Sequence, residues 1–432
     1  MPKHRHEFRD PIHTFITVST DERAVVDSRF FQRLRHIHQL ALTYLVYPGA
    51  THRRFEHCLG VMDLAGRVFD VLTADDNRRA HALGIVPSGE MSYWRTVVRM
   101  GGLCHDLGHI PFSHGAENLL AEGYHHERLS YDIITGVEMS SIFESMTPPL
   151  RPLDVAKVAV GLKDWPGDAT DFTPWQALMS EIVTGDAFGV DRIDYLLRDS
   201  HHAGVAYGRF DHHRLIDTLR ILWDDDQEKP IIGIEQGGLH SAEALQLARY
   251  SMFEQLYYHR VRRALDLHLR QFMAAYLPRG VYSVDLEDHL RQTDNEVLAA
   301  MRMAVDEPQS EAHDVADRIM NRRFYRVLYQ RRAEDLERNP NAVELVYRAA
   351  ADEFGKHAVE RDAQPPKTRP LEFAVERDDD VVVSSQQLSQ VLQQLPSAHF
   401  DYVFIIPEKL EDARKWLGAQ LRGILDQPLE ET

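Results

Sequence analysis

The stretch from Gly101 to His114 constrains this chain most, because it places His105 and Asp106 side by side behind an apolar run. The apolar residues predict the buried face of a helix, and they are Val97, Val98, Met100 and Leu103. Gly108 and Pro111 then indicate that this helix ends here. A neutral imidazole and an ionised carboxylate are ligands for divalent metals. The alternative is that His105 and Asp106 are buried, cap the helix and satisfy each other's hydrogen bonds without binding a metal.

Composition bounds the class of protein. Of 432 residues, 44% are hydrophobic and 27% are charged, which is ordinary for a globular chain with a large core. No apolar run reaches about 18 residues and no signal peptide is recognisable, so we expect a cytoplasmic protein that does not contact membranes. A net charge of −18 argues against extended nucleic-acid binding, without excluding it or a local basic pocket. Cys58 and Cys104 are expected to be free, buried thiols.

Periodicity predicts a mainly α fold with short β-hairpins. Amphipathic patterns predict helices over residues 27–42, about 51–72, 154–162, 241–268 and within 321–353. A Pro-rich break at residues 364–370 precedes two short strands, 381–383 and 402–406, and helices near 386–394 and 408–422. We therefore expect one large domain in residues 1–360 and a small α+β appendage in residues 371–432.

Two further candidate ligands lie at the starts of other predicted helices. His57 falls in the first turn of the helix over 51–72, and Asp191 begins a helix that continues to Gly204. Together with His105 and Asp106 they would form a four-ligand site that leaves positions for an acidified water. The set suits one divalent ion (Mn, Fe, Zn, Co or Mg), with additional Mg carried by substrate phosphates. Arg54 also lies at a predicted helix N-terminus, where a phosphate is favoured.

Several motifs resemble the HD-domain deoxynucleoside triphosphate triphosphohydrolases, a class that includes the catalytic domain of the human sterile-alpha-motif-and-HD enzyme. They are Phe31–Arg35, Tyr47–His57, Leu103–His109, Pro111–His114, Asp191–Tyr195 and Arg198–Gly204. The likeness runs from about Phe8 to His268 and continues more weakly into the appendage. It implies an HD-domain helical phosphohydrolase core and assigns the metal to His57, His105, Asp106 and Asp191.

The resemblance also implies the catalytic and substrate-binding residues. Arg54 would meet the phosphate chain, and His114, His126 and Glu117 would line the site of attack, with His114 as the acid for the leaving oxygen. The family usually has Asp where this chain has Glu117. Gln39 and Asp199 would bind the sugar 3′-hydroxyl. The remaining substrate contacts would come from Arg192, Tyr195, Arg249, Tyr257 and His259.

A candidate regulatory nucleotide site is implied by Asp27, Gln32 and Arg35, which match guanine-reading positions of the family. The strand near Ile234 to Gly237 lacks the basic pair that holds activator phosphates in the family. We therefore expect a homo-oligomer, a dimer or tetramer, whose assembly is either constitutive or triggered by nucleotide in a different way.

The implied reaction converts a deoxynucleoside triphosphate (dNTP) and water to a deoxynucleoside and tripolyphosphate. Three arginines placed at the phosphates, Arg54, Arg192 and Arg249, favour this substrate. A nucleoside monophosphatase or a single-stranded nucleic-acid exonuclease would use the same metal site. A non-enzymatic nucleotide sensor would not need all four metal ligands, so their presence argues against it.

Overall fold

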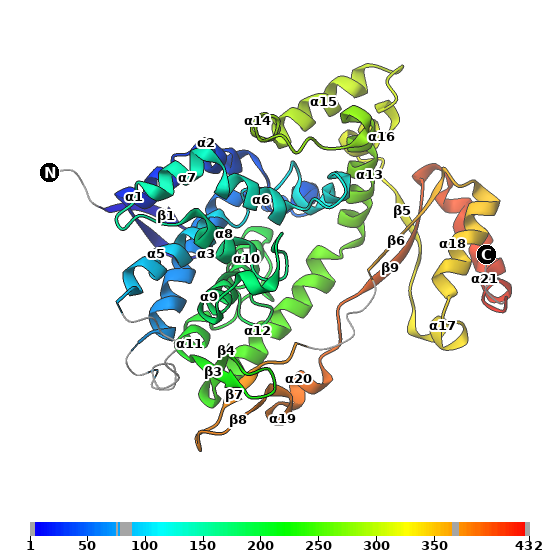
Figure 1. Ribbon diagram of the computed structural model, residues 1–432. Coiled ribbons are helices and arrows are strands. Elements are labelled where there is room, and N and C mark those ends of the chain that lie inside the picture. Colours follow the sequence, from blue (N-terminus) through cyan, green and yellow to red (C-terminus); the bar gives the residue numbers. More distant parts are fainter. Residues whose placement is uncertain (1–4, 75–76, 78–88, 365–370, 428–432) are drawn as a thin grey trace. The chain divides into compact units, whose positions relative to one another are not determined.

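The computed structural model describes residues 5–74, 77, 89–364 and 371–427. The chain forms two compact units that alternate along the sequence (Figure 1). The first comprises residues 1–252, 282–295 and 370–395, and the second comprises residues 253–281, 296–369 and 396–432. The chain returns from the second unit to the first between residues 364 and 371, inside the predicted boundary, and strands on both sides of this interval pair in the same sheets. The division into a domain of residues 1–360 and an appendage of residues 371–432 stays a prediction.

The mainly α fold class is confirmed, and the first unit is built on helices α3 (Arg54–Leu72) and α5 (Met91–Cys104). Helix α3 packs on α5 and α10, and α5 packs on α8. Gly101 permits the close contact between α5 and α8, because a Cβ at this position would lie 2.4 Å from Val158 Cγ1. The other helices of this unit are α1 (Thr20–Val26), α2 (Arg29–Arg33), α6 (His126–Thr135), α7 (Val137–Glu144), α8 (Pro152–Val160), α9 (Pro174–Thr184), α10 (Val190–Ala203), α11 (His212–Asp217), α12 (Leu239–Met252), α14 (Leu286–Arg291), α19 (Ser385–Leu388) and α20 (Gln390–Gln394).

Two small sheets complete the first unit. Strands β1 (Arg5–Asp10) and β2 (Thr14–Ser19) form an antiparallel hairpin in which Phe8 pairs with Ile16. A sheet of order β3-β4-β7-β8 joins β3 (Leu219–Asp224) and β4 (Lys229–Glu235) to β7 (Ala374–Glu376) and β8 (Val382–Ser384). Strands β4 and β7 are parallel, and the other two pairs are antiparallel.

The predicted helix over residues 27–42 is wrong. Ser28 caps α2, since its side chain accepts a hydrogen bond from Phe31 N, but α2 ends at Arg33 and is followed by the 3-10 turns Leu34–His36 and Ala41–Leu45. Between these turns Ile37 is extended, and His38 pairs with Arg53 in an isolated β-bridge. Apolar spacing predicted a continuous helix here because it does not register these pairings with distant segments.

The second unit packs helices on a three-stranded antiparallel sheet of order β5-β9-β6 (Figure 1). Its strands are β5 (Arg326–Gln330), β6 (Val359–Gln364) and β9 (Phe400–Ile405). Its helices are α13 (Arg260–Tyr276), α15 (Asp294–Asp306, which begins in the first unit), α16 (His313–Met320), α17 (Ala333–Arg338), α18 (Ala342–Phe354) and α21 (Leu410–Leu425). The hydrophobic core lies between the sheet, α18 and α21, around Val346, Val403 and Ile405.

Two long helical predictions are interrupted in the structure. The predicted helix over 241–268 divides into α12 and α13, with a π-helical turn at Phe253–Tyr257 between them. The predicted helical stretch 321–353 contains strand β5, whose partner β9 lies more than 70 residues further along the chain. Across the parts of the chain that the structure describes, no helix has both the length and the apolarity that a membrane span requires.

Candidate active site

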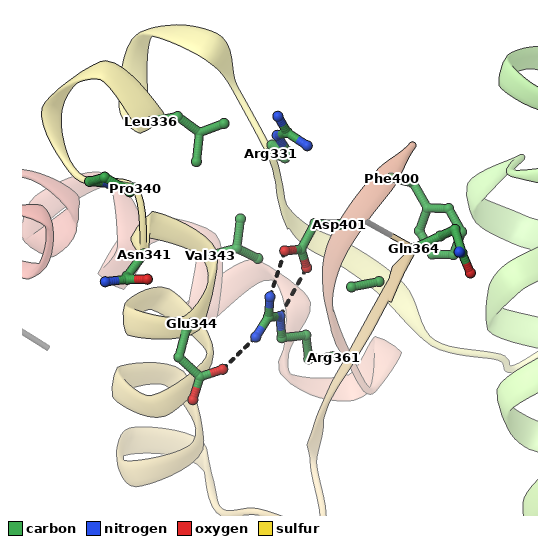
Figure 2. Close-up of a pocket in the computed structure, with 11 residues that line it drawn as sticks. Arg331, Leu336, Pro340, Asn341, Val343, Glu344, Arg361, Gln364, Phe400 and Asp401 are labelled. Atoms are coloured by element: carbon green, nitrogen blue, oxygen red, sulfur yellow. Dashed lines mark hydrogen bonds and ion pairs between the residues drawn. The ribbon is translucent and has the colours of Figure 1, made fainter. Parts of the chain in front are cut away.

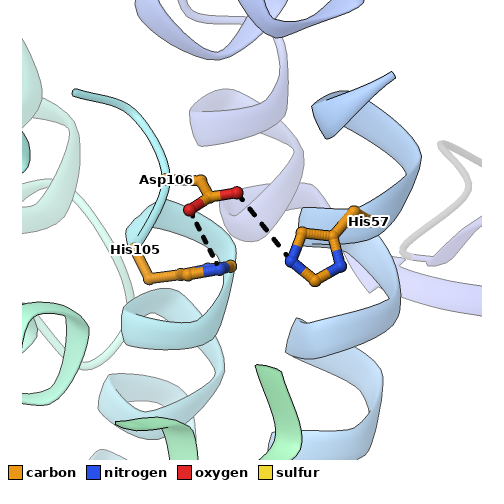
Figure 3. A group of neighbouring side chains, drawn as sticks. All are labelled: His57, His105 and Asp106. Carbon is orange, nitrogen blue, oxygen red and sulfur yellow. Dashed lines mark ion pairs between the residues drawn. The ribbon is translucent and has the colours of Figure 1, made fainter. Parts of the chain in front are cut away.

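Four side chains of the first unit bring nitrogen and oxygen donors together. His57 lies in the first turn of α3, His105 caps the end of α5 with Asp106 next to it, and Asp191 lies in the first turn of α10. His57 Nε2 is 3.0 Å from Asp191 Oδ1 and 3.8 Å from Asp106 Oδ2. His105 Nε2 is 3.3 Å from Asp106 Oδ1 and 3.5 Å from Asp191 Oδ1. Figure 3 shows His57 on α3 facing His105 and Asp106, which lie next to each other at the end of α5.

The hydrogen bonding of the His105 ring is that expected of a metal ligand. Its Nδ1 donates a hydrogen bond of 2.8 Å to Gly102 O, which leaves Nε2 as the atom that faces the cluster. Nε2 is buried and makes no hydrogen bond within the described residues. A buried polar atom without a partner costs free energy, and a divalent cation would satisfy this one. The Asp191 side chain keeps 39% of its surface exposed, so the cluster is accessible to solvent.

The other imidazole is oriented from behind by Asp194, one turn after Asp191 on α10. His57 Nδ1 donates to Asp194 Oδ2 at 2.7 Å, which directs Nε2 into the cluster. Asp194 is fully buried and also accepts from His13 Nε2 at 2.6 Å and from Arg198 Nε at 2.8 Å. Such carboxylates fix the tautomer and the ring orientation of metal-binding histidines.

The electrostatics of the cluster favour a cation. Burial alone would lower the pKa of His57, but the Asp191 and Asp194 carboxylates raise it to about 10. Burial alone would raise the pKa of Asp106, but the Arg54 guanidinium and the His105 ring hold it well below its usual range. The carboxylates are therefore ionised at neutral pH and stabilise positive charge between them.

Asp106 also connects the cluster to a second group of basic side chains. Arg54 Nη1 donates to Asp106 Oδ2, and Arg54 Nε donates to Ser113 Oγ at 2.7 Å. His109 Nε2 lies 3.1 Å from Asp106 Oδ1, and the His109 ring stacks on His126 with ring centroids 3.8 Å apart. An arginine and two imidazoles therefore lie next to the candidate metal site.

The pKa values of the two stacked imidazoles are shifted in opposite directions. His126 Nδ1 lies 2.5 Å from Glu117 Oε1, and its Nε2 lies 3.1 Å from Glu127 Oε1. Burial would lower the pKa of His126, but these carboxylates raise it above its usual value. Burial and the Arg54 charge hold the pKa of His109 well below its usual value. One ring can thus carry a proton while its neighbour stays neutral.

The predicted phosphate-binding residues outside this group lie together on α10 and α12. Tyr195 hydrogen-bonds both Arg192 and Arg249. Arg192 Nη1 also donates to the carbonyls of Gly185, at 3.1 Å, and Asp186. Burial lowers the pKa of Arg249 and raises that of Tyr195. The structure therefore brings Arg192, Tyr195 and Arg249 into one hydrogen-bonded cluster that begins one residue after Asp191.

The predicted sugar-binding pair is connected through His52. Gln39 N donates to His52 O at 3.0 Å, and His52 Nε2 lies 2.7 Å from Asp199 Oδ1. The His52 and Asp199 side chains are buried, with 0% and 2% of their surface exposed. Gln39 Oε1 and His52 Nδ1 are buried atoms that have no hydrogen-bond partner within the described residues.

Two other predicted substrate-binding residues, Tyr257 and His259, lie at the ends of neighbouring elements of secondary structure. Tyr257 ends the π-helical turn and His259 caps α13, where its ring accepts from Val261 N; both belong to the second unit. The side chain of His114 lies outside the described part of the structure, so its role as the acid for the leaving oxygen stays a prediction.

Of the three candidate regulatory residues, Asp27 caps the end of α1, Gln32 lies in α2 and Arg35 lies in the 3-10 turn that follows α2. Arg35 Nε donates to Gln32 Oε1 at 2.8 Å, and the Arg35 guanidinium lies 3.5 Å from the centre of the Phe55 ring. Asp27 forms an exposed ion pair of 3.1 Å with Arg23. The two predicted free cysteines, Cys58 and Cys104, are confirmed as buried thiols.

Sequence reasoning missed four residues that the structure places in or directly behind the site. His109 and Asp194 each lie three residues after a candidate ligand, Asp106 and Asp191, so a search at one helical turn could have found them. Nothing in the local sequence distinguishes the other two, which are His13 and His52.

A cavity of about 710 Å³ lies in the second unit, and none of the predicted site residues lines it (Figure 2). Its central charge is Arg361, which donates to Asp401 at 2.9 and 2.6 Å and to Glu344 at 2.6 Å. Because every nitrogen of this guanidinium already faces a carboxylate, Arg361 is not available to bind an anionic ligand.

Two protein families and a solved structure match this chain. The HD domain family matches residues 54–196, which contain all four candidate ligands, and the HD associated region family matches residues 210–406. A crystal structure of a hypothetical protein from Aquifex aeolicus superposes with a TM-score of 0.78 at 29% identity, over 96% of this chain and 100% of that one.

Curated relatives include both uncharacterised proteins and enzymes. The uncharacterised protein YwfO of Bacillus subtilis is 30% identical over 77% of this chain and 72% of its own length. The deoxynucleoside triphosphate triphosphohydrolases SAMHD1 of Gallus gallus and Homo sapiens are 30% and 32% identical, over 77% and 60% of this chain. The matched regions cover 57% and 42% of those two enzymes, so the chain spans about half of their length.

Proposed function

The chain belongs to the HD-domain family of phosphohydrolases related to the deoxynucleoside triphosphate triphosphohydrolases, and on that premise we propose that it hydrolyses dNTPs to deoxynucleosides and tripolyphosphate. One observation carries the proposal. Asp106 is shared between the candidate metal cluster and Arg54, so a phosphate held by Arg54 would lie beside the metal. Relatives that carry the enzyme's name support the choice of substrate.

The donor set fits one divalent metal ion held by His57, His105, Asp106 and Asp191. When bound, such an ion lowers the pKa of a water ligand and neutralises phosphate charge. The ligand chemistry suits Mn, Fe, Zn, Co or Mg, and additional Mg can enter with the substrate phosphates.

The residues beside the cluster would hold the triphosphate. Arg54 offers a planar guanidinium to the phosphate next to Asp106, and Arg192 and Arg249 offer two more near Asp191. A tripolyphosphate carries roughly four negative charges at neutral pH, and arginine forks bind such oxygens in pairs. With this local positive charge, the overall negative charge of the chain is no obstacle to substrate binding.

The reaction requires one bond exchange and one proton. The water oxygen bonds to the α-phosphorus, the bond from that phosphorus to the sugar O5′ breaks, and O5′ takes up a proton. His126, whose charge Glu117 stabilises, would hold positive charge beside the reacting phosphate. His114 stays our candidate for the acid that protonates O5′.

The sugar would be held by Gln39 and Asp199. His52 fixes the Asp199 carboxylate, and Gln39 Oε1 is a buried acceptor available to a hydroxyl group. Tyr257 and His259 are proposed to complete the wall over the triphosphate and sugar. We also propose a homo-oligomer and a regulatory nucleotide site at Asp27, Gln32 and Arg35; sedimentation with and without dGTP tests both.

Product analysis by ion-exchange chromatography tests the proposed reaction. The purified protein is incubated with each dNTP and each NTP in Mg²⁺ or Mn²⁺, with dGTP added as a second nucleotide in parallel samples. We expect deoxynucleoside and tripolyphosphate from the protein and neither from Asp106→Ala. No turnover of any triphosphate would refute the proposal, and the same samples assayed with monophosphates and single-stranded DNA would identify the alternative substrate.

A further inference from the structure

The segment Tyr282–Asn295 belongs to the first unit, although the chain before and after it belongs to the second. This segment is hydrogen-bonded to the loop that follows the candidate ligands. His289 Nε2 lies 3.1 Å from Leu107 O, and Arg33 joins the two segments by donating to His289 O at 2.7 Å and to His109 O at 2.8 Å. The loop after Asp106 is therefore held in part by a residue 182 positions further along the chain.

Asp294 makes the central contacts of this attachment. Its side chain is fully buried, and its two oxygens face different segments. Oδ1 accepts from Phe112 N at 2.7 Å. Oδ2 accepts from His38 N at 2.7 Å and lies 2.6 Å from His38 Nδ1. One carboxylate thus joins the segment around His38 to the loop that carries Ser113 and His114.

The loop needs such an anchor because its backbone is strained. Phe112 and Ser113 have φ angles of 57° and 55°, in the left-handed region that side chains with a Cβ rarely adopt. Two such residues in succession persist only where surrounding contacts hold them, and strain of this kind gathers at functional sites. Neither residue is glycine, so the conformation is imposed by the contacts and not by local preference.

The strained turn sets the position of Arg54. Ser113 Oγ donates to His38 O at 3.4 Å and accepts from Arg54 Nε at 2.7 Å. Arg54 in turn donates to Asp106. A continuous series of contacts therefore runs from Asp294 through Phe112 and Ser113 to the guanidinium beside the candidate metal site.

We propose that Asp294 is a positioning residue, whose carboxylate holds the left-handed turn at Phe112 and Ser113 so that Ser113 orients the Arg54 guanidinium for phosphate binding. Asp294 itself does not touch the cluster or the substrate. The link from Arg54 to phosphate rests on the proposed function, whereas the effect of Asp294 on the turn does not.

Crystal structures of Asp294→Ala and Asp294→Asn test the effect on the turn. The alanine removes both acceptors, and the asparagine keeps the volume and one acceptor oxygen in case the alanine variant does not fold. We expect the left-handed turn at Phe112 and Ser113 or the Arg54–Ser113 hydrogen bond to be lost. A variant structure that retains both would overturn the proposal, whatever the substrate of the protein is.

Calorimetric titration with inorganic tripolyphosphate tests the link to phosphate. We expect Asp294→Ala and Ser113→Ala each to weaken binding about tenfold, the size of one charge-assisted hydrogen bond, and the double variant also to weaken it about tenfold. Additive losses of about a hundredfold would mean that Asp294 does not act through Ser113 and would overturn the proposal. Asp306→Asn, an exposed change at the other end of α15, should bind normally. If the unmodified protein binds no tripolyphosphate, the proposed function fails, and the crystal structures alone decide the role of Asp294.

Discussion

Asp194→Asn is expected to weaken metal binding about 10–100-fold, although Asp194 is not one of the four candidate ligands. The carboxylate of Asp194 receives hydrogen bonds from His57 at 2.7 Å, from His13 at 2.6 Å and from Arg198 at 2.8 and 2.9 Å. An asparagine has one acceptor oxygen, and its NH₂ group would face N–H donors. The His57 ring would therefore lose the charged partner that directs Nε2 toward the metal.

Two free energies follow from this geometry. The expected loss of metal affinity corresponds to about 1.4–2.7 kcal/mol. The free energy of unfolding of the metal-free protein should fall by about 3–5 kcal/mol, because Arg198 keeps only one of its two buried carboxylate partners. That partner is Asp10, at 2.7 Å from Arg198 Nη1.

The assay separates these effects. Mn²⁺ is titrated calorimetrically into protein stripped with a chelator, and guanidinium unfolding is followed without metal. The matched control is Asp70→Asn, whose carboxylate also pairs with an arginine, Arg95 at 2.7 Å, but is half exposed. This control should change either quantity by less than about 1 kcal/mol. If folded Asp194→Asn binds Mn²⁺ as tightly as the unmodified protein, or if Asp70→Asn weakens binding equally, our account of how His57 is oriented is wrong.

Three further predictions concern other parts of the first unit. Burial raises the pKa of Glu22, but its buried pair with Arg99 brings it below the ordinary 4.5. The ion pair with Arg99 therefore stabilises the folded protein fully above about pH 4.5, and this stabilisation is lost as the pH falls through the lowered pKa of Glu22. Urea unfolding should therefore show Glu22→Gln about 3 kcal/mol less stable at pH 7, with a difference that shrinks in acid. Arg54→Lys keeps the charge but loses the planar fork, so tripolyphosphate binding measured by calorimetry should weaken about tenfold; equal binding would contradict the role of Arg54. Asp199→Asn should raise the KM for dNTPs about tenfold but leave that for 2′,3′-dideoxynucleotides unchanged, because only the former have a 3′-hydroxyl.

The sequence was sufficient to predict the fold class and the family. Ligand-type residues at helix ends, such as His105 and Asp106, have strong local signals because each sits beside an apolar run and a helix stop. The helices that carry the four candidate ligands depend on local periodicity, and the structure contains all three, α3, α5 and α10. The assignment of these side chains to a metal stays a prediction, and the structure adds that the Nε2 atom of each histidine lies between 3.0 and 3.8 Å from an oxygen of both aspartates.

The features that were not predicted depend on contacts distant in sequence. His38 breaks the expected helix over 27–42 by bonding Asp294, 256 residues away. His13 bonds Asp194 across 181 residues. Strand β5 forms only because β9 lies beside it. A local pattern has no access to such partners, so propensity alone gave a helix in the first and third cases.

Helix α10 carries both a candidate metal ligand, Asp191, and the residue that orients another ligand, Asp194, so the positions of the two depend on each other. Asp191 and Asp194 lie one turn apart, so one faces the candidate metal while the other bonds the back of His57 on α3. This requires α3 and α10 to approach closely, and Gly60 on α3 allows it. A Cβ on Gly60 would lie 2.0 Å from Asp194 Oδ1 and 2.5 Å from Arg198 Nη2. The orientation of His57 therefore depends on the close packing of α3 and α10, and this packing requires a glycine one turn after His57.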